Sequence, residues 1–330
     1  MTSSIQLALK RLRSHVHQTP LVESSQLNRM LGARILFKAE NLQKVGAFKA
    51  RGACNCLIAR IESGEMPIRV IANSSGNHAQ AVAWAARQFS IPATIYMPKN
   101  VSSIKAQATR AYGAKVIFGD DRAKVDQMTE EASEDEGVFW IPPYNHHDVI
   151  AGQGTSVFEV LEQDQEFDAV FAPCGGGGLL SGCLIACREF SEHIQVIGVE
   201  PSEACDAYES VKTGKIQRLS EAPDTIADGA RTLSIGNKTY PHLQQLDDWF
   251  LAEEEDILYW TQWLNHLLKI RVEPTAAMVM QGVVGWLRKQ RENKRLLVVL
   301  SGGNMDAQTT AKIWKRDRLC ITPGKKYPLR

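Results

Sequence analysis

The chain lacks long hydrophobic runs and has no dominant sign of charge. No apolar stretch approaches the about 18 residues that a membrane-spanning helix requires. The first residues, Met1–Ile5, lack the charged and apolar regions of a signal peptide. With 38 basic and 37 acidic residues the net charge is +1, so the composition gives no basis for a nucleic-acid or membrane partner. The expected partner is a small molecule.

Paired cysteines are lacking as well. The seven cysteines are an odd number and include no Cys-x-x-Cys pair or other metal-ligand spacing. This favours reduced thiols in a cytoplasmic protein. Length sets a further bound, because 330 residues are more than one compact core usually holds. We therefore expect two domains, or one domain inserted into another.

Short β-rich runs alternate with longer helical patterns along most of the chain, which is typical of parallel sheets covered by helices. The predicted strands cover residues 34–38, 70–72, 93–97, 115–118, 169–172, 195–199 and 296–300. The predicted helices cover residues 50–61, 78–89, 102–112, 122–136, 149–161, 179–190 and 276–289. Two prolines, Pro142 and Pro143, interrupt the alternation. We predict an α/β fold in which a small domain, 69–144, is inserted into a large domain formed by 1–68 and 145–330.

Polar or glycine-rich segments follow three of the predicted strands, at Asn73–His78, Cys174–Leu179 and Ser301–Asn304. Ligands of open parallel sheets bind at such strand ends. The glycines at 175–178 let backbone N–H groups approach an anion at a helix N-terminus. This run is neither a G-x-G-x-x-G fingerprint nor a Walker A loop. It predicts a site for a monophosphate rather than for a dinucleotide or a triphosphate.

A lysine, Lys49, stands at the start of a predicted helix, among the small residues Gly46, Ala47, Ala50 and Gly52. A lysine of lowered pKa can bond to an aldehyde. A monophosphate cofactor and an activatable lysine together suggest pyridoxal 5'-phosphate.

With these residues the chain resembles the threonine/serine dehydratase and serine racemase group of fold-type II (tryptophan synthase beta-like) pyridoxal-phosphate enzymes. Six motifs carry the resemblance in order, at residues 47–53, 74–78, 149–155, 175–179, 273–276 and 301–304. The resemblance implies two open parallel-sheet domains with helices on both faces and the active site between them. It also implies a homodimer. Because the chain ends about thirty residues after Ser301, we expect no C-terminal regulatory domain.

The resemblance assigns cofactor-binding roles. Lys49 would hold the cofactor as a Schiff base and then act as the base that takes the Cα proton. Phe48 would pack beside the ring, and Asn77 would hydrogen-bond its phenolate oxygen. The phosphate would be bound by Gly175, Gly176, Gly177 and Gly178. Ser301 would face the pyridine nitrogen with a neutral hydroxyl, which suits elimination.

The same resemblance places the substrate on the loop formed by Ser74, Ser75, Gly76 and His78. Ser75 matters most, because in racemase-like members the matching serine returns a proton to Cα on the face opposite the lysine. In pure dehydratases this loop holds the substrate carboxylate instead. Both interpretations of Ser75 remain open from the sequence.

A cation site is implied at Glu200, Ala204 and Asp206, where racemase-like members use a glutamate, a backbone carbonyl and an aspartate. Oxygen ligands suit magnesium, calcium or manganese (Mg²⁺, Ca²⁺ or Mn²⁺) rather than zinc. The alternative is that these are ordinary loop acids.

The sequence thus predicts a pyridoxal-phosphate ammonia-lyase that converts a small β-hydroxy amino acid, such as L-threonine or L-serine, into a 2-oxo acid and ammonia. The alternatives are a racemase of serine or of an aspartate-like amino acid, and a 3-hydroxyaspartate dehydratase. Three positions depart from the family pattern, Ala47, Pro142–Tyr144 and Ala277–Met278, so the identity of the substrate stays open.

Overall fold

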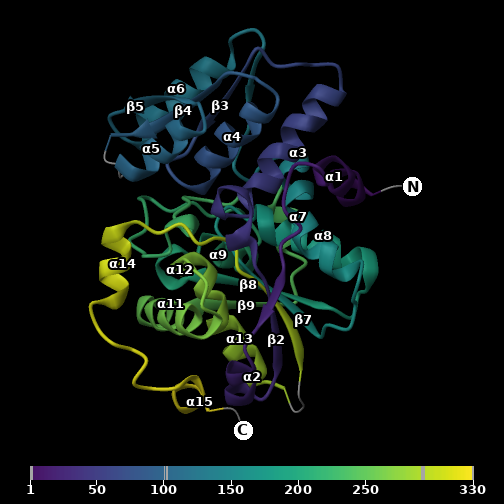
Figure 1. Cartoon of the computed structure of the whole chain (residues 1–330), viewed down its shortest axis with the longest axis vertical. Coiled ribbons are helices and arrows are strands. Elements are labelled where there is room, and N and C mark those ends of the chain that lie inside the picture. The colour runs from purple at the N-terminus through teal and green to yellow at the C-terminus, as the bar shows by residue number, and fades with distance from the viewer. Residues whose placement is uncertain (1–2, 100, 102, 291–293, 329–330) are drawn as a thin grey trace.

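The computed structural model describes residues 3–99, 101, 103–290 and 294–328. Two separate sheets, each covered by helices, are stacked along the long axis of the molecule (Figure 1). The larger sheet has the strand order β1-β2-β10-β7-β8-β9 and the smaller one β5-β4-β3-β6. The α/β fold predicted from the sequence is confirmed.

The large sheet collects strands from both ends of the chain. Its strands are β1 (Leu21–Glu23), β2 (Arg34–Lys38), β7 (Ala169–Pro173), β8 (Gln195–Pro201), β9 (Asp248–Ala252) and β10 (Arg295–Val299). The last strand, β10, lies inside the sheet, where it pairs in parallel with both β2 and β7. Every residue of β7 is buried, as expected for a parallel strand that is covered on both faces.

One strand departs from the expectation of two parallel sheets. β1 pairs with β2 in antiparallel fashion, so the large sheet is mixed. The physical reason is the short connection. Only residues 24–33 separate the two strands, whereas a parallel crossover needs about a dozen residues or more.

The small sheet is entirely parallel and lies within residues 69–140. Its strands are β3 (Arg69–Asn73), β4 (Ala93–Pro98), β5 (Lys115–Gly119) and β6 (Val138–Trp140), and its helices are α4 (Asn77–Gln88), α5 (Ser103–Ala111) and α6 (Arg122–Ser133). Three of the four strands coincide with predicted runs, and β6 was not predicted. Ser102, the predicted first residue of α5, lies outside the described residues.

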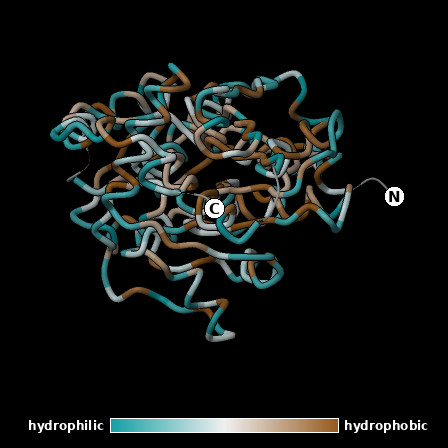
Figure 2. Tube along the Cα trace, turned by 90° about the horizontal axis from the view of Figure 1, so that it is seen from below, coloured by the Kyte–Doolittle hydropathy of each residue, from teal (hydrophilic) through white to brown (hydrophobic). Residues whose placement is uncertain are grey.

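Helices in the middle of the molecule join the two sheets. α4, α3 (Lys49–Glu62), α7 (His147–Leu161) and α8 (Gly178–Phe190) pack in that order. Residues 149–161 of α7 are all buried, as in a helix enclosed on every side. Figure 2 shows the same separation by hydropathy, with hydrophobic segments through the interior and hydrophilic segments in peripheral loops.

The single helix predicted for 276–289 is divided. α12 covers Pro274–Ala277 and α13 covers Val279–Leu287. The amide of Gln281 bonds to the carbonyl of Met278, only three residues back (3.0 Å), so the turn tightens at the junction. Across the described ranges, no helix combines the length and the apolar character needed to cross a membrane.

Candidate active site

A cavity of about 1450 Å³ lies between the two sheets. All three junction segments singled out in the sequence line it, together with Lys49. The segments follow β3, β7 and β10, so each stands at the carboxyl end of a parallel strand. The topology therefore brings together residues as distant in the sequence as Lys49 and Ser301, as expected for a ligand site of an open sheet.

The segment that carries the lysine is fixed directly to the segment after β10. The amide of Phe48 donates to the carbonyl of Ser301 (3.0 Å), and the amide of Gly303 donates to the carbonyl of Gly46 (3.0 Å). Ala47 forms an antiparallel bridge with Gly302 between them. These backbone bonds hold Lys49 and Ser301 at one end of the cavity.

The Lys49 amine points into the cavity. Its Nζ donates to the carbonyl of Pro143 (2.7 Å) and lies 4.9 Å from the centre of the Phe48 ring. Burial disfavours the charged form and lowers the pKa of Lys49 to about 8, against the attraction of the Glu273 carboxylate. The pKa shift makes the neutral amine accessible near physiological pH.

The glycine run forms a close-packed turn at the start of α8. A Cβ on Gly176 would overlap the ring of Tyr144. Gly177 has a φ of +87°, which side chains rarely allow. Tyr144 is itself fixed, because its hydroxyl donates to the carbonyl of Ser234 (3.0 Å). The turn thus depends on glycine at two successive positions.

A polar network that the sequence did not assign surrounds Asn77. Its side-chain amide donates to both carboxylate oxygens of Glu273 (3.2 Å each), and its Oδ1 accepts from Asn304 Nδ2 (2.8 Å). Burial and the nearby Asp228 raise the pKa of Glu273 to about 8. Both Glu273 and Asn304 belong to motifs visible in the sequence, but their contact with Asn77 arises only in the fold.

The loop of the predicted substrate residues lies between β3 and α4. Ser74, Ser75 and Gly76 line the cavity. His78 is nearly fully buried, and its Nε2 donates to the carbonyl of Ile141 (2.8 Å). Burial, together with the Lys49 charge, lowers the pKa of His78 to about 3, so the imidazole is neutral. The ring therefore anchors the loop to the end of β6.

The predicted cation residues form a buried acidic pair outside the lysine pocket. Glu200 accepts from the amides of Ala207 (3.3 Å) and Tyr208 (2.8 Å) at the start of α9 (Asp206–Thr213). Both carboxylate oxygens of Asp206 are buried with no hydrogen-bond partner in the described part of the chain. Burial raises the pKa of Asp206 to about 7. No cluster of three or more His, Cys, Asp or Glu side chains within the described ranges could hold a metal, and Ala204 would contribute only a carbonyl.

Comparisons with known proteins decide the family. The model of the pyridoxal-phosphate dependent enzyme family matches residues 12–302. The chain belongs to this family. It is 41% identical over 313 residues to an L-threo-3-hydroxyaspartate ammonia-lyase of Saccharomyces cerevisiae, covering 93% of this chain and 94% of that protein. It is 40% identical over 309 residues to a serine racemase of Schizosaccharomyces pombe, covering 92% and 94%. The crystal structure of a threonine deaminase from T.th. superposes with a TM-score of 0.86 at 40% identity, covering 92% and 98%.

The residues of this pyridoxal-phosphate enzyme fit the cofactor. Ser301 Oγ is buried and has no hydrogen-bond partner among the described residues, so a donor or acceptor is available for a ring nitrogen. No side chain of the described residues caps the N-terminus of α8 at Gly177, so the backbone N–H groups of the glycine turn at 175–178 are available to an anion. Lys49 supplies an amine of lowered pKa in the same cavity. When bound, pyridoxal phosphate withdraws electrons from the α-carbon of an amino acid.

Cofactor uptake by this pyridoxal-phosphate enzyme is expected to depend on pH through Lys49. Only the neutral amine is a nucleophile, and the pKa of Lys49 is about 8. The rate at which apoprotein takes up pyridoxal phosphate should fall about tenfold per pH unit below pH 8 and level off above it. Stopped-flow absorbance from pH 6 to 9 measures this rate. A rate that does not change over this range would contradict the assignment of Lys49.

Proposed function

We propose that this protein is a dehydratase of small β-hydroxy amino acids such as L-threonine and L-serine. In the proposed reaction the Cα–H and Cβ–O bonds break and water leaves. The resulting enamine then tautomerises and is hydrolysed to a 2-oxo acid and ammonia. The names of the relatives, which include an ammonia-lyase, a racemase and a threonine deaminase, support this reaction class.

The observation that carries the proposal is that Lys49 and Ser301 line the same cavity, with the amide next to Lys49, that of Phe48, bonded to the Ser301 carbonyl. In our proposal, the Lys49 amine takes the proton from Cα, which requires a base that is neutral at working pH. Burial lowers its pKa to about 8. Ser301 presents a neutral hydroxyl where a carboxylate would stabilise a protonated ring nitrogen, and a less electron-withdrawing ring favours prompt loss of the β-hydroxyl.

We propose that residues 69–144 close over the bound substrate. They carry the Ser74–His78 loop, while Lys49 and Ser301 come from the remainder of the chain. One ion pair already joins the two parts at the cavity: Lys105 Nζ on α5 lies 2.6 Å from Asp228 Oδ2. Closure would exclude water from the Cα proton and strengthen the polar contacts inside.

A substrate screen tests the proposed function. Purified holoenzyme is incubated with L-serine, L-threonine and the threo and erythro forms of L-3-hydroxyaspartate. Release of 2-oxo acid and ammonia is measured together with the enantiomer of the remaining amino acid. Equimolar oxo acid and ammonia from at least one substrate is expected. Formation of the opposite enantiomer without release of 2-oxo acid would contradict the dehydratase and indicate a racemase.

A second candidate function, racemisation, is favoured by Ser75, because this serine lines the same cavity as Lys49. A hydroxyl on the face opposite the lysine could return a proton to Cα with inverted configuration. We predict that Ser75→Ala lowers D-serine formation by about 100-fold, as expected for loss of one acid–base group, while L-serine elimination falls much less. Chiral chromatography with a parallel pyruvate assay measures both rates. An equal loss of both rates would contradict separate faces.

Glu200 and Asp206 are proposed to bind a divalent cation with oxygen ligands, the Ala204 carbonyl and water completing the shell. The carboxylate oxygens of Asp206, which are buried and have no hydrogen-bond partner among the described residues, support this site. We predict that Mg²⁺, Ca²⁺ or Mn²⁺ raises the melting temperature, because a ligand that binds only the folded state stabilises it. Asp206→Asn should abolish the increase, whereas Glu203→Gln, a change at a nearby exposed acid, should preserve it. If the cation raised the melting temperature of Asp206→Asn as much as that of the wild type, the cation would have to bind at another site.

A further inference from the structure

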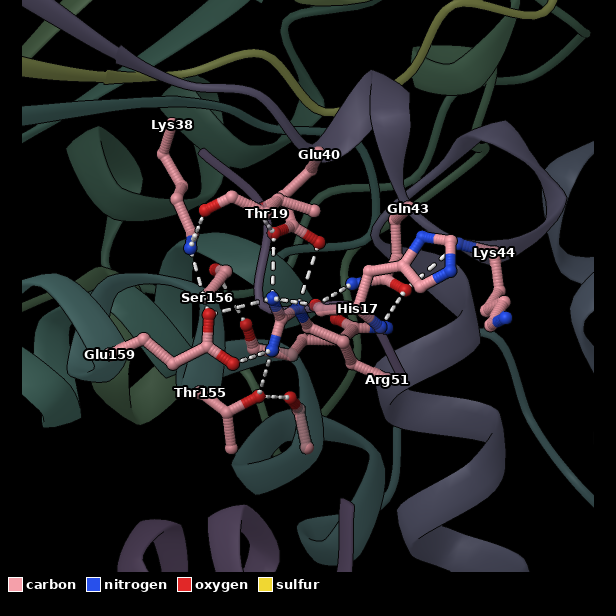
Figure 3. Close-up of polar contacts among 12 residues, drawn as sticks. His17, Thr19, Lys38, Glu40, Gln43, Lys44, Arg51, Thr155, Ser156 and Glu159 are labelled. Atoms are coloured by element: carbon pink, nitrogen blue, oxygen red, sulfur yellow. Dashed lines mark hydrogen bonds and ion pairs between the residues drawn. The ribbon is translucent and has the colours of Figure 1, made fainter. Parts of the chain in front are cut away.

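Behind the active site, four charged side chains meet in the protein interior (Figure 3). Arg51 on α3 and Glu40 in the turn after β2 are fully buried, and Lys38 and Glu159 are nearly so. Arg51 Nε and Nη2 donate to the two oxygens of Glu40 (2.8 Å each). Its Nη1 and Nη2 donate to the two oxygens of Glu159 (2.7 and 2.9 Å). A single guanidinium thus holds two carboxylates from different elements.

The cluster is balanced in charge and well supplied with hydrogen bonds. Lys38 Nζ donates to Glu159 (2.8 Å) and to the carbonyl of Thr19 (2.7 Å), and the Thr19 hydroxyl donates to Glu40 (2.5 Å). Burial alone would raise the pKa of Glu40, but the Arg51 guanidinium outweighs it and the net shift is downward. Removing ions from water is costly, and such clusters seldom increase net stability. In some proteins such clusters instead fix one arrangement of the elements they join.

Arg51 lies two residues after Lys49 in the first turn of α3. At about 100° per residue, side chains two positions apart leave a helix on nearly opposite sides. Lys49 accordingly lines the cavity, while Arg51 enters the buried cluster. Within the described part of the chain, no side chain caps this helix N-terminus at Phe48, so the first turn is not held by a side-chain cap.

The other end of the same arrangement is α7. Glu159 belongs to α7, and so does Gln153, whose Nε2 donates to the carbonyl of Pro143 (3.2 Å). That carbonyl also accepts from Lys49 (2.7 Å). The two helices touch through their backbones, because a Cβ at position 152 would lie 2.6 Å from the Arg51 carbonyl oxygen. The lysine amine and α7 are therefore linked through the Pro143 carbonyl, and α7 is linked to the Arg51 guanidinium through Glu159. Because Arg51 and Lys49 both belong to α3, these contacts connect the two side chains by a second route besides the helix itself.

We propose that Arg51 is a positioning residue for Lys49: by holding Glu40 and Glu159 it fixes the rotation of the first turn of α3 and so directs the lysine amine to the Pro143 carbonyl. The inference rests on the proposed role of Lys49. It adds a residue that does not touch the cofactor or the substrate and acts through the helix that carries the lysine.

The test compares Arg51→Lys with Lys38→Met. The first variant keeps the positive charge but cannot form the guanidinium hydrogen bonds to both Glu40 and Glu159. The second removes another partner of Glu159 from the same cluster, but from strand β2 instead of α3. For each variant, melting temperature, the pH dependence of pyridoxal-phosphate uptake by apoprotein, and kcat and KM with the best substrate are measured.

We expect Arg51→Lys to weaken the contact of the Lys49 amine with the Pro143 carbonyl and to expose that amine to water. The pH midpoint of cofactor uptake should rise by at least about half a unit, and uptake at pH 7.5 should slow by about threefold. Because misplacing a reacting group by about 1 Å costs up to about 100-fold in rate, kcat should fall more than tenfold with little change in KM. Lys38→Met should keep the wild-type midpoint and a kcat within about threefold, even at an equal loss of melting temperature.

Equal midpoints and equal kcat in Arg51→Lys, Lys38→Met and the wild type would overturn the proposal, as would changes that simply follow melting temperature in both variants. Glu159→Gln keeps the side-chain shape and weakens the grip on Arg51. It should shift the midpoint in the same direction and provides the test if Arg51→Lys does not fold. Borohydride reduction and peptide mapping of the wild type distinguish a failure of the positioning role of Arg51 from a failure of the proposed role of Lys49. A label on a lysine other than Lys49 refutes the role of Lys49 itself.

Discussion

Lys49→Ala is expected to abolish both the visible absorbance of bound pyridoxal phosphate and the release of 2-oxo acid. The amine is the one group in our proposal that both anchors the cofactor and removes the Cα proton. Loss of such a group lowers kcat by at least about 10⁴-fold. Absorbance spectra of the purified variant, recorded after dialysis against the cofactor, and a coupled oxo-acid assay measure the two effects.

A neighbouring lysine provides the control for this substitution. Lys44 precedes the active lysine by five positions and belongs to a short 3₁₀ turn outside α3. Lys44→Ala should retain the absorbance and most of the activity. If Lys49→Ala kept the absorbance, or if both variants lost it, the anchor would have to be sought at another amine.

Gly176→Ala is expected to cause the second largest loss, through the cofactor's phosphate. The added methyl group would overlap the Tyr144 ring, so the turn at 175–178 must shift and misalign its N–H groups. Anion binding by backbone N–H groups depends on their direction. We expect the affinity for pyridoxal phosphate to fall by about 100-fold, corresponding to about 3 kcal/mol. Fluorescence titration of apoprotein measures it.

The overlap can be relieved, which makes this prediction specific. In the double variant Gly176→Ala with Tyr144→Ala, the ring that blocks the methyl group is absent, and most of the affinity should return relative to Tyr144→Ala alone. Gly214→Ala is a useful comparison, because no described residue lies within 4 Å of an added Cβ there, and the positive φ of this glycine, which Gly176 lacks, adds only local backbone strain. An equal loss of affinity in Gly214→Ala would show a general effect on stability instead of a local one.

The sequence predicted the parts of the fold that depend on continuous burial. β7 is apolar along its whole length, and β10 is apolar after its first residue, Arg295, because helices cover both faces. β6 has only three residues, all half-buried, and β9 lies at the sheet edge and is also mainly half-buried. Both contain short apolar runs, 138–141 and 249–252, but neither was predicted as a strand, and the run of β6 ends directly before Pro142 and Pro143, which mark a break in the pattern.

The candidate site was predictable to a similar degree. Lys49 and the three junctions could be found because parallel topology sends strand ends to one place. The Pro143 carbonyl could not be predicted as the partner of Lys49, because every residue has a carbonyl. Which carbonyl accepts from the lysine depends on the path of the chain in the folded protein. Arg51 stands inside a motif, but its partner Glu159 is 108 positions away. Its role emerges only when α3 and α7 are packed together.

The central place of β10 in the large sheet has a consequence for biosynthesis. Residues 295–299 separate β2 from β7, so the sheet remains in two pieces, each with an open edge, until these residues have left the ribosome. Open strand edges invite pairing with other chains. Ser301, which joins the lysine segment through Phe48, emerges later still. A chain that stops before residue 295 therefore leaves the centre of the sheet unfilled and cannot complete the pocket, and its unpaired strand edges favour aggregation.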